Sequence, residues 1–120
     1  MPWFLYRQNN SGGLFERTEN IRNLVFIEAV DGESANLYAE SIGIYFNGCK
    51  SGRDCSCCGD RWYPVWDDSD GITIEQVRGY IESYAKFNSK GFADYISAIL
   101  HYADGRKKDI LFTPTTLDNL

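Results

Sequence analysis

Three cysteines gather within four residues near the middle of the chain. Cys55, Cys57 and Cys58 form a C-x-C-C run, and Cys49 lies six positions upstream. Two cysteines separated by two residues have the spacing of a zinc knuckle, and structural zinc takes four ligands in a tetrahedral arrangement. The sequence therefore predicts a candidate structural zinc site at these four cysteines, with His101 or an aspartate as an alternative fourth ligand.

Two other interpretations of the cysteines stay open. The usual second knuckle is missing, and a closed site would have to wrap around the adjacent Cys57 and Cys58. In the first interpretation, two of the thiols are buried as small hydrophobic groups that tighten the turn before Gly59. In the second, they form a redox dithiol, although the usual βαβ pattern does not surround them. In a reducing cytoplasm, thiols or metal ligands are favoured over disulfides.

An arginine and several aromatic residues follow the cysteines directly. A guanidinium binds phosphate or carboxylate through two parallel hydrogen bonds, and indole or phenol rings stack on nucleobases. The alternative is that the tryptophans anchor the loop onto a sheet while Arg61 pairs with Asp60 or Asp67. In the functional interpretation, the ligand-binding residues are Arg61, Trp62, Tyr63 and Trp66, and Arg53 adds positive charge nearby.

A glycine-rich segment near the N-terminus is a further candidate. Asn10, Ser11, Gly12 and Gly13 have the composition of a turn, which is the simpler interpretation. In the functional interpretation, successive backbone N–H groups there form a nest for a phosphate or a ribose. No Walker or dinucleotide fingerprint accompanies the segment.

The catalytic inventory of the chain is thin. His101 is the only histidine, and a lone histidine on a strand is more often structural than a general base. A Cys/His dyad stays open, but the sequence contains no nucleophile elbow, metalloprotease pair or kinase motif. The acidic run at residues 67–70 lacks the downstream glutamate of a calcium loop. We therefore expect a binding protein, not an enzyme.

Composition narrows the classes of ligand. The chain has 120 residues, a net charge of −5 and 15% aromatic residues. An acidic chain lacks the basic face that long nucleic acids require, but a local cationic spot suffices for a small phosphate ligand. No apolar run approaches the roughly 20 residues of a membrane span, and the first residues do not resemble a signal peptide. We expect a cytoplasmic protein with no membrane partner.

Local patterns predict a single α+β domain over residues 1–120. Strands are expected at residues 3–8 and 24–30, and helices at residues 34–42 and 73–86. Residues 92–112 are interpreted as a C-terminal hairpin turning at Asp104 and Gly105, and a last helix over residues 93–102 is the alternative. Thr73 and Gln76 have capping-box spacing, and Gly43 is placed to end the first helix. The expected fold is an antiparallel sheet of about four strands with two helices, a long cysteine-rich loop at residues 47–71, and a loose tail at residues 113–120.

Three segments carry a resemblance to a known group of proteins. Residues 8–13 (QNNSGG), 45–48 (YFNG) and 54–62 (DCSCCGDRW) resemble a family of small bacteriophage proteins, mostly of unknown function. At the level of protein class, such proteins are similar to phage anti-defence sponges. Sponges bind cyclic dinucleotide or cyclic ADP-ribose signals without cleaving them, usually as oligomers.

The resemblance implies a function but transfers no ligand residues. It implies a non-enzymatic counter-defence protein that sequesters a nucleotide-derived immune second messenger in the host cytoplasm, as a homo-oligomer. One alternative is a small zinc-stabilised phage protein that binds and inhibits a host protein. Another is a nucleotide-degrading enzyme.

Overall fold

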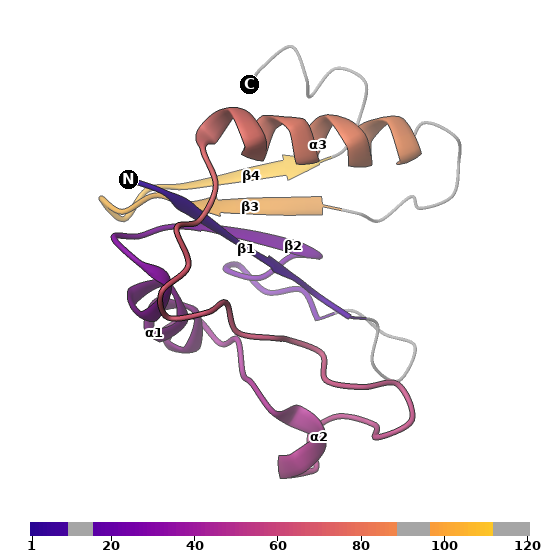
Figure 1. Cartoon of the computed structure of the whole chain (residues 1–120). Coiled ribbons are helices and arrows are strands. Elements are labelled where there is room, and N and C mark those ends of the chain that lie inside the picture. The colour runs from indigo at the N-terminus through magenta and orange to yellow at the C-terminus, as the bar shows by residue number, and fades with distance from the viewer. Residues whose placement is uncertain (10–15, 89–96, 112–120) are drawn as a thin grey trace.

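A computed structural model describes residues 1–9, 16–88 and 97–111 of the chain. In these residues, four strands form one sheet and three helices lie around it (Figure 1). The elements in chain order are β1 (Trp3–Arg7), β2 (Leu24–Glu28), α1 (Gly32–Ser41), α2 (Gly48–Ser51), α3 (Ile74–Asn88), β3 (Ser97–His101) and β4 (Lys107–Leu111). The predicted α+β class and the order of its main elements are confirmed. The expected loose tail at residues 113–120 lies outside the described residues.

The sheet is mixed, which corrects the expectation of an antiparallel sheet. The strand order is β1-β2-β3-β4, and β2 pairs with β3 in parallel, whereas the two outer pairs are antiparallel. The chain leaves β2, passes through all three helices and returns beside β2 in the same direction. A parallel pair requires such a long crossover. The unbroken apolar run at the start of β2 agrees with this arrangement, because a central strand is covered on both faces.

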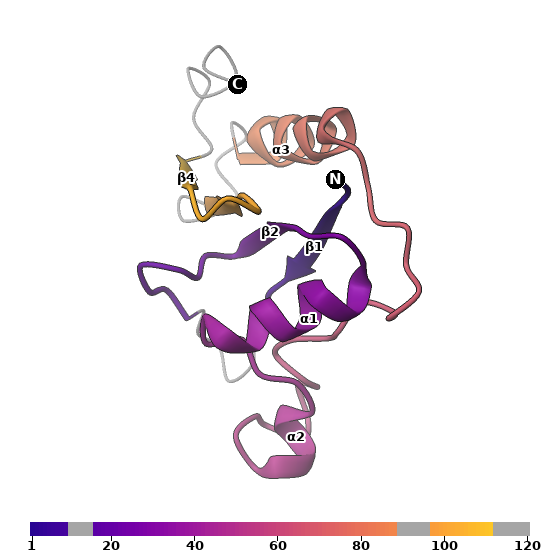
Figure 2. The ribbon, with the colours of Figure 1, turned by 90° about the vertical axis from the view of Figure 1, so that its left-hand side faces the viewer.

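Each face of the sheet is covered by a different layer. Val77 and Ile81 of α3 pack with residues of all four strands on one face. On the other face, Ala35 and Ala39 of α1 pack with strand residues and with Trp62 from the cysteine-rich loop. Figures 1 and 2 show α3 on one side of the sheet and α1 on the other, with α2 projecting beyond α1. The loop thus belongs to the packing of the second face.

The predicted helix ends are confirmed in atomic detail. The Gln76 backbone N–H donates to Thr73 Oγ1 at 3.1 Å, and the Thr73 N–H donates to Gln76 Oε1 at 2.8 Å. This reciprocal pair is a capping box. Gly43 follows α1 with a φ of +108°, a backbone conformation that glycine adopts without steric cost.

The sequence did not predict the short helix α2. Residues 47–71 are predicted to form one long loop, but Asn47 has a left-handed φ of 58° and a helix begins at Gly48. A Cβ atom on Gly48 would lie 1.8 Å from Asp54 Oδ2. The turn at Gly48 therefore depends on its close contact with Asp54, six positions away. Such a contact produces no periodic pattern from which a helix could be predicted.

Candidate functional site in the cysteine loop and at the edge of β1

The cysteine-rich loop is built around a buried carboxylate, Asp54. Its side chain is 0% exposed. Tyr45 donates its hydroxyl to Asp54 Oδ1 at 2.6 Å, and the Arg61 backbone N–H donates to Oδ2 at 2.8 Å. The Arg61 Nε atom lies 3.8 Å from Oδ1. A buried charge is costly unless it is paired and hydrogen-bonded, and this network supplies such partners. It ties Asp54 and Arg61 of the loop to Tyr45, which precedes the loop.

Arg61 faces into the protein. Its side chain is only 11% exposed. Nε donates to the Tyr45 hydroxyl at 3.0 Å, and an Nη atom donates to Gln8 Oε1 at 2.9 Å. Its carboxylate neighbours include Asp54 and Glu16, whose oxygens both lie 3.8 Å from Nε. The guanidinium expected to bind a ligand therefore joins the loop to the strand that begins the chain.

The two tryptophans of this segment have opposite environments. Trp62 is 0% exposed and lies in the core beneath α1, so neither face of its indole is open for stacking. The alternative that this tryptophan anchors the loop to the sheet fits the structure. Trp66 is 82% exposed and Tyr63 is 58% exposed. Arg53 is exposed and lies over the Tyr45 ring, 3.7 Å from its centroid.

The N-terminal strand continues directly into contact with the loop. Asn9 donates its side-chain amide to the carbonyl oxygens of Cys58 and Asp60 at 2.8 and 3.1 Å, and its backbone N–H donates to the Arg61 carbonyl at 2.8 Å. The glycine-rich candidate residues that follow, Asn10, Ser11, Gly12 and Gly13, lie outside the described residues.

Three of the four predicted metal ligands come together. The Sγ atoms of Cys55, Cys57 and Cys58 lie within 4.8 Å of one another, all three side chains are exposed, and none of the chain's four cysteines forms a disulfide. This cluster could hold a metal ion and is compatible with structural zinc. The fourth predicted ligand, Cys49, instead directs its thiol to the Cys55 carbonyl at 3.4 Å.

The thiols of the loop differ in acidity. Hydrogen bonds from Cys57 lower the pKa of Cys55 below its usual 9.0. The same pairing raises the pKa of Cys57 to about 11. Burial of the sulfur and the neighbouring Asp60 raise the pKa of Cys49 to about 11. Of these three, Cys55 is the one whose surroundings favour the thiolate.

His101 has a structural environment. It is 0% exposed, its Nε2 lies 2.8 Å from the Asn20 carbonyl oxygen, and its Nδ1 lies 3.3 Å from the Tyr38 hydroxyl. Since a carbonyl can only accept, Nε2 carries the proton and Nδ1 accepts from Tyr38. Burial lowers the pKa of His101 below its usual 6.5. Both ring nitrogens are thus occupied within the fold.

Sequence reasoning missed a cleft at the edge of the sheet. It has a volume of about 400 Å³ and is lined by Leu5, Arg7, Tyr63, Pro64, Val65 and Tyr80. The Arg7 guanidinium lies 5.3 Å from the centroid of the Tyr80 ring. Tyr63 is the predicted ligand residue that lines it. Arg7 and Tyr80 gave no signal, because they lie on different elements and meet only in the folded chain.

The main chain of β1 is open beside this cleft. Even-numbered residues of β1 hydrogen-bond to β2, so the odd-numbered ones direct their N–H and C=O groups outward. Trp3 pairs in both directions with Ile72 at 2.8 Å, and Asn9 donates to Arg61. Between these two clamps, the outward backbone groups of Leu5 and Arg7 have no partner among the residues that the structure describes.

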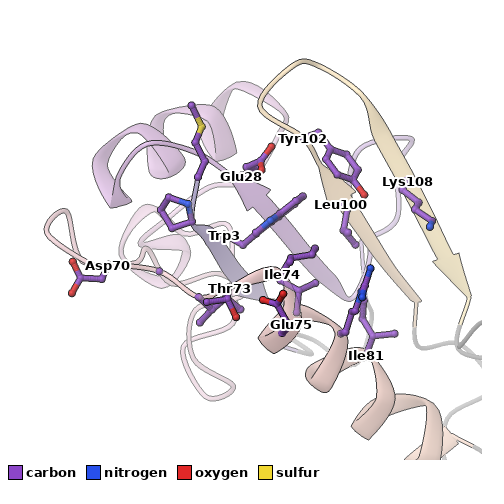
Figure 3. A pocket seen from close by; sticks show the side chains of 16 residues that line it. Trp3, Glu28, Asp70, Thr73, Ile74, Glu75, Ile81, Leu100, Tyr102 and Lys108 are labelled. Carbon is purple, nitrogen blue, oxygen red and sulfur yellow. The ribbon is translucent and has the colours of Figure 1, made fainter. Parts of the chain in front are cut away.

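A larger hollow of about 660 Å³ lies between the sheet and the start of α3 (Figure 3). Trp3 and Tyr102 form one side of it, and their rings meet edge to face with their centroids 5.1 Å apart. Its charged lining combines the carboxylates of Glu28, Asp70 and Glu75 with the cations of Arg78 and Lys108. The lining of the cleft beside β1 includes the cation of Arg7 and no carboxylate.

Comparison with known proteins identifies a family and no function. The family model described as "Domain of unknown function (DUF7296)" matches residues 1–118. No curated protein and no solved structure matches the chain. No helix in the described ranges is long and apolar enough to cross a membrane.

Proposed function

We propose that this chain, which belongs to the DUF7296 family, is a non-catalytic protein that binds and sequesters a small nucleotide-derived ligand in the cleft beside β1. One observation carries the proposal. An arginine and two tyrosines, Arg7, Tyr63 and Tyr80, line one cleft that has no carboxylate in its lining. This is the combination that the sequence suggested for Arg61 and Trp62, supplied by different residues.

The chemistry of the cleft suits a nucleotide in three ways. The Arg7 guanidinium provides a cation with several hydrogen-bond donors for a phosphate. The Tyr63 and Tyr80 rings provide flat faces for a base or a ribose. The outward N–H and C=O groups of Leu5 and Arg7 offer a donor and an acceptor to the edge of a base. The open edge is less suited to an added β-strand from another protein. Strands usually span about 17–20 Å, so such a strand would displace the backbone pair at Trp3 or the one at Asn9.

The biological part of the proposal rests on the sequence resemblance. It assigns the chain to phage counter-defence, with a cyclic dinucleotide or a cyclic ADP-ribose as the sequestered signal and a homo-oligomer as the working form. Sequestration needs tight binding without turnover. The described side chains of the cleft include a cation and aromatic rings, and they do not include a carboxylate, cysteine or histidine for general acid–base or nucleophilic chemistry.

Replacing Arg7 by glutamine is expected to weaken ligand binding by about tenfold to a hundredfold, because hydrogen bonds to charged groups contribute about 1.5–3 kcal/mol. The measurement is calorimetry of the full chain against a panel of cyclic dinucleotides and cyclic ADP-ribose isomers. Arg53→Gln is the matched control, because Arg53 lies over Tyr45 and away from the residues that line the cleft. Ligand recovered intact after denaturation distinguishes sequestration from degradation.

Two results would count against this site. The absence of binding by every member of the panel removes the proposed ligand class. Binding that Arg53→Gln weakens and Arg7→Gln leaves unchanged moves the site to the cysteine loop.

A second candidate function is favoured by the exposure of Trp66. In this alternative the chain is a zinc-stabilised module that binds and inhibits a host protein. The Trp66 carbonyl packs against Gly32 at the start of α1, since a Cβ on that glycine would lie 1.9 Å from the carbonyl oxygen. The backbone is thus held in place while the indole is 82% exposed. Exposed aromatic anchors of this kind are enriched at protein interfaces.

Trp66→Ala separates the two candidates. In the second one, this substitution abolishes capture of a host protein by the immobilised full chain, and zinc analysis of the purified protein finds about one ion per chain. In the first, Trp66→Ala leaves binding of the small ligand unchanged, because Trp66 does not line the cleft.

A further inference from the structure

The cysteine cluster has a geometry of its own, independent of the ligand cleft. Cys55, Cys57 and Cys58 come from four consecutive residues, and their Sγ atoms lie within 4.8 Å of one another. Those of Cys57 and Cys58 are 3.7 Å apart. Three sulfurs this close together could all be ligands of a single metal ion.

The turn that carries these thiols is held by the main chain. The Cys58 N–H donates to the Cys55 carbonyl at 3.2 Å, and the Asn9 amide donates to the Cys58 carbonyl at 2.8 Å. Gly59 then leaves the turn with a φ of +84°. These hydrogen bonds fix the backbone of the turn, and its three thiols are exposed and close together.

Cys49 does not complete the cluster. Its thiol is directed to the Cys55 carbonyl at 3.4 Å, and its backbone N–H donates to Asp60 Oδ1 at 2.9 Å. The preceding Gly48 packs against the buried Asp54 carboxylate. These contacts hold Cys49 in a position where its sulfur contacts the Cys55 carbonyl and lies outside the cluster of the other three sulfurs.

We propose that Cys55, Cys57 and Cys58 form an open metal site that binds one soft cation, Zn²⁺ or Cu⁺, through three thiolates and leaves one coordination position to an outside ligand. Structural zinc sites are closed by four protein ligands, whereas sites with three protein ligands accept an exogenous fourth ligand. Thiolates also select Cu⁺. Because all three sulfurs are exposed, a small thiol or a side chain of another protein can reach the remaining position.

The test uses the full chain, reduced and stripped of metal, and titrates it with Co²⁺ as a spectroscopic substitute for Zn²⁺. Cys55→Ser, Cys57→Ser and Cys58→Ser are each expected to lower Co²⁺ affinity at least about tenfold and to reduce the thiolate-to-cobalt charge-transfer absorbance. Cys49→Ser is the matched control and is expected to match the wild type in both. Adding a small monothiol is expected to increase the absorbance of the wild type, because a fourth sulfur enters the open position.

Separate titrations with Zn²⁺ and Cu⁺, each against a chelator of known affinity, identify which cation the site prefers. The proposal is overturned if Cys49→Ser loses as much affinity and absorbance as Cys55→Ser, since the site is then closed by four thiolates of one chain. It is also overturned if the monothiol has no effect on the wild type, or if none of the three ions binds. Circular dichroism of each variant verifies that the fold is retained.

Discussion

Asp54→Ala is expected to lower the free energy of unfolding by about 3–5 kcal/mol, the usual range for removing one partner of a buried charged network. The substitution removes the acceptor of the Tyr45 hydroxyl and of the Arg61 backbone N–H, at 2.6 and 2.8 Å. It also removes the carboxylate that lies 3.8 Å from Arg61 Nε, in a side chain that is only 11% exposed. Urea denaturation followed by circular dichroism measures the loss.

Asp68→Ala is the matched control for Asp54→Ala. Asp68 is an exposed carboxylate in the same long loop, and substitutions at such positions usually change stability by less than about 0.5 kcal/mol. If the two variants unfold at the same urea concentration, the Asp54 network does not stabilise the fold. Asp54→Asn keeps the shape of the side chain, so a substantial loss in this variant assigns the effect to the charge and its acceptor atoms.

Trp62→Ala is expected to cost about 3–5 kcal/mol, the usual range for truncating a buried tryptophan. The ring is 0% exposed and packs in the core beneath α1. Trp66→Ala, four residues later, is expected to change stability by no more than about 0.5 kcal/mol, because its side chain is 82% exposed. Thermal and urea unfolding of both variants tests this contrast between two tryptophans of one loop.

Trp62→Phe refines the second prediction. The Trp62 Nε1 atom is buried, and in the described part of the chain it has no hydrogen-bond partner. Phenylalanine removes this unpaired donor and keeps most of the apolar contact, so its cost is expected to be well below that of alanine. A Trp62→Phe variant as unstable as Trp62→Ala would show that the full indole shape is required. Equal stability of Trp62→Ala and the wild type would contradict the core assignment.

These contrasts divide the cysteine loop into two parts. Asp54, Arg61 and Trp62 have the contacts of a scaffold that joins the loop to β1 and to the core. Tyr63, Trp66 and the thiols of the turn are exposed. Substitutions in the first group are therefore expected to act through stability, and substitutions in the second through binding. A binding assay on the first group needs a stability measurement beside it.

The sequence predicted the elements whose signals are local. The capping box at Thr73 and Gln76, the glycine after α1 and the hairpin turn at Asp104 and Gly105 each depend on residues within a few positions of one another. All of these features are present in the structure. The convergence of Cys55, Cys57 and Cys58 is local in the same sense, since chain connectivity alone keeps three thiols within four residues close together.

The direction of the central strand pair was beyond local reasoning. The β2 pattern shows that this strand is buried, but burial is equally compatible with a parallel or an antiparallel neighbour. The direction depends on the long connection between β2 and β3, which contains three helices. Long-range closure of this kind has no signature within a window of ten or twenty residues.

The candidate site shows the same division between local and long-range information. The sequence by itself determined that a thiol cluster, an arginine and aromatic rings lie close together along the chain at residues 55–66. Only the tertiary structure decided that Arg61 and Trp62 face inward, and that Arg7 and Tyr80 meet Tyr63 at the open edge of β1. The physical reason is that the exposure of a side chain depends on what packs against its segment. Here the segments that meet are far apart in the sequence: Arg7 and Tyr63 are separated by more than fifty residues.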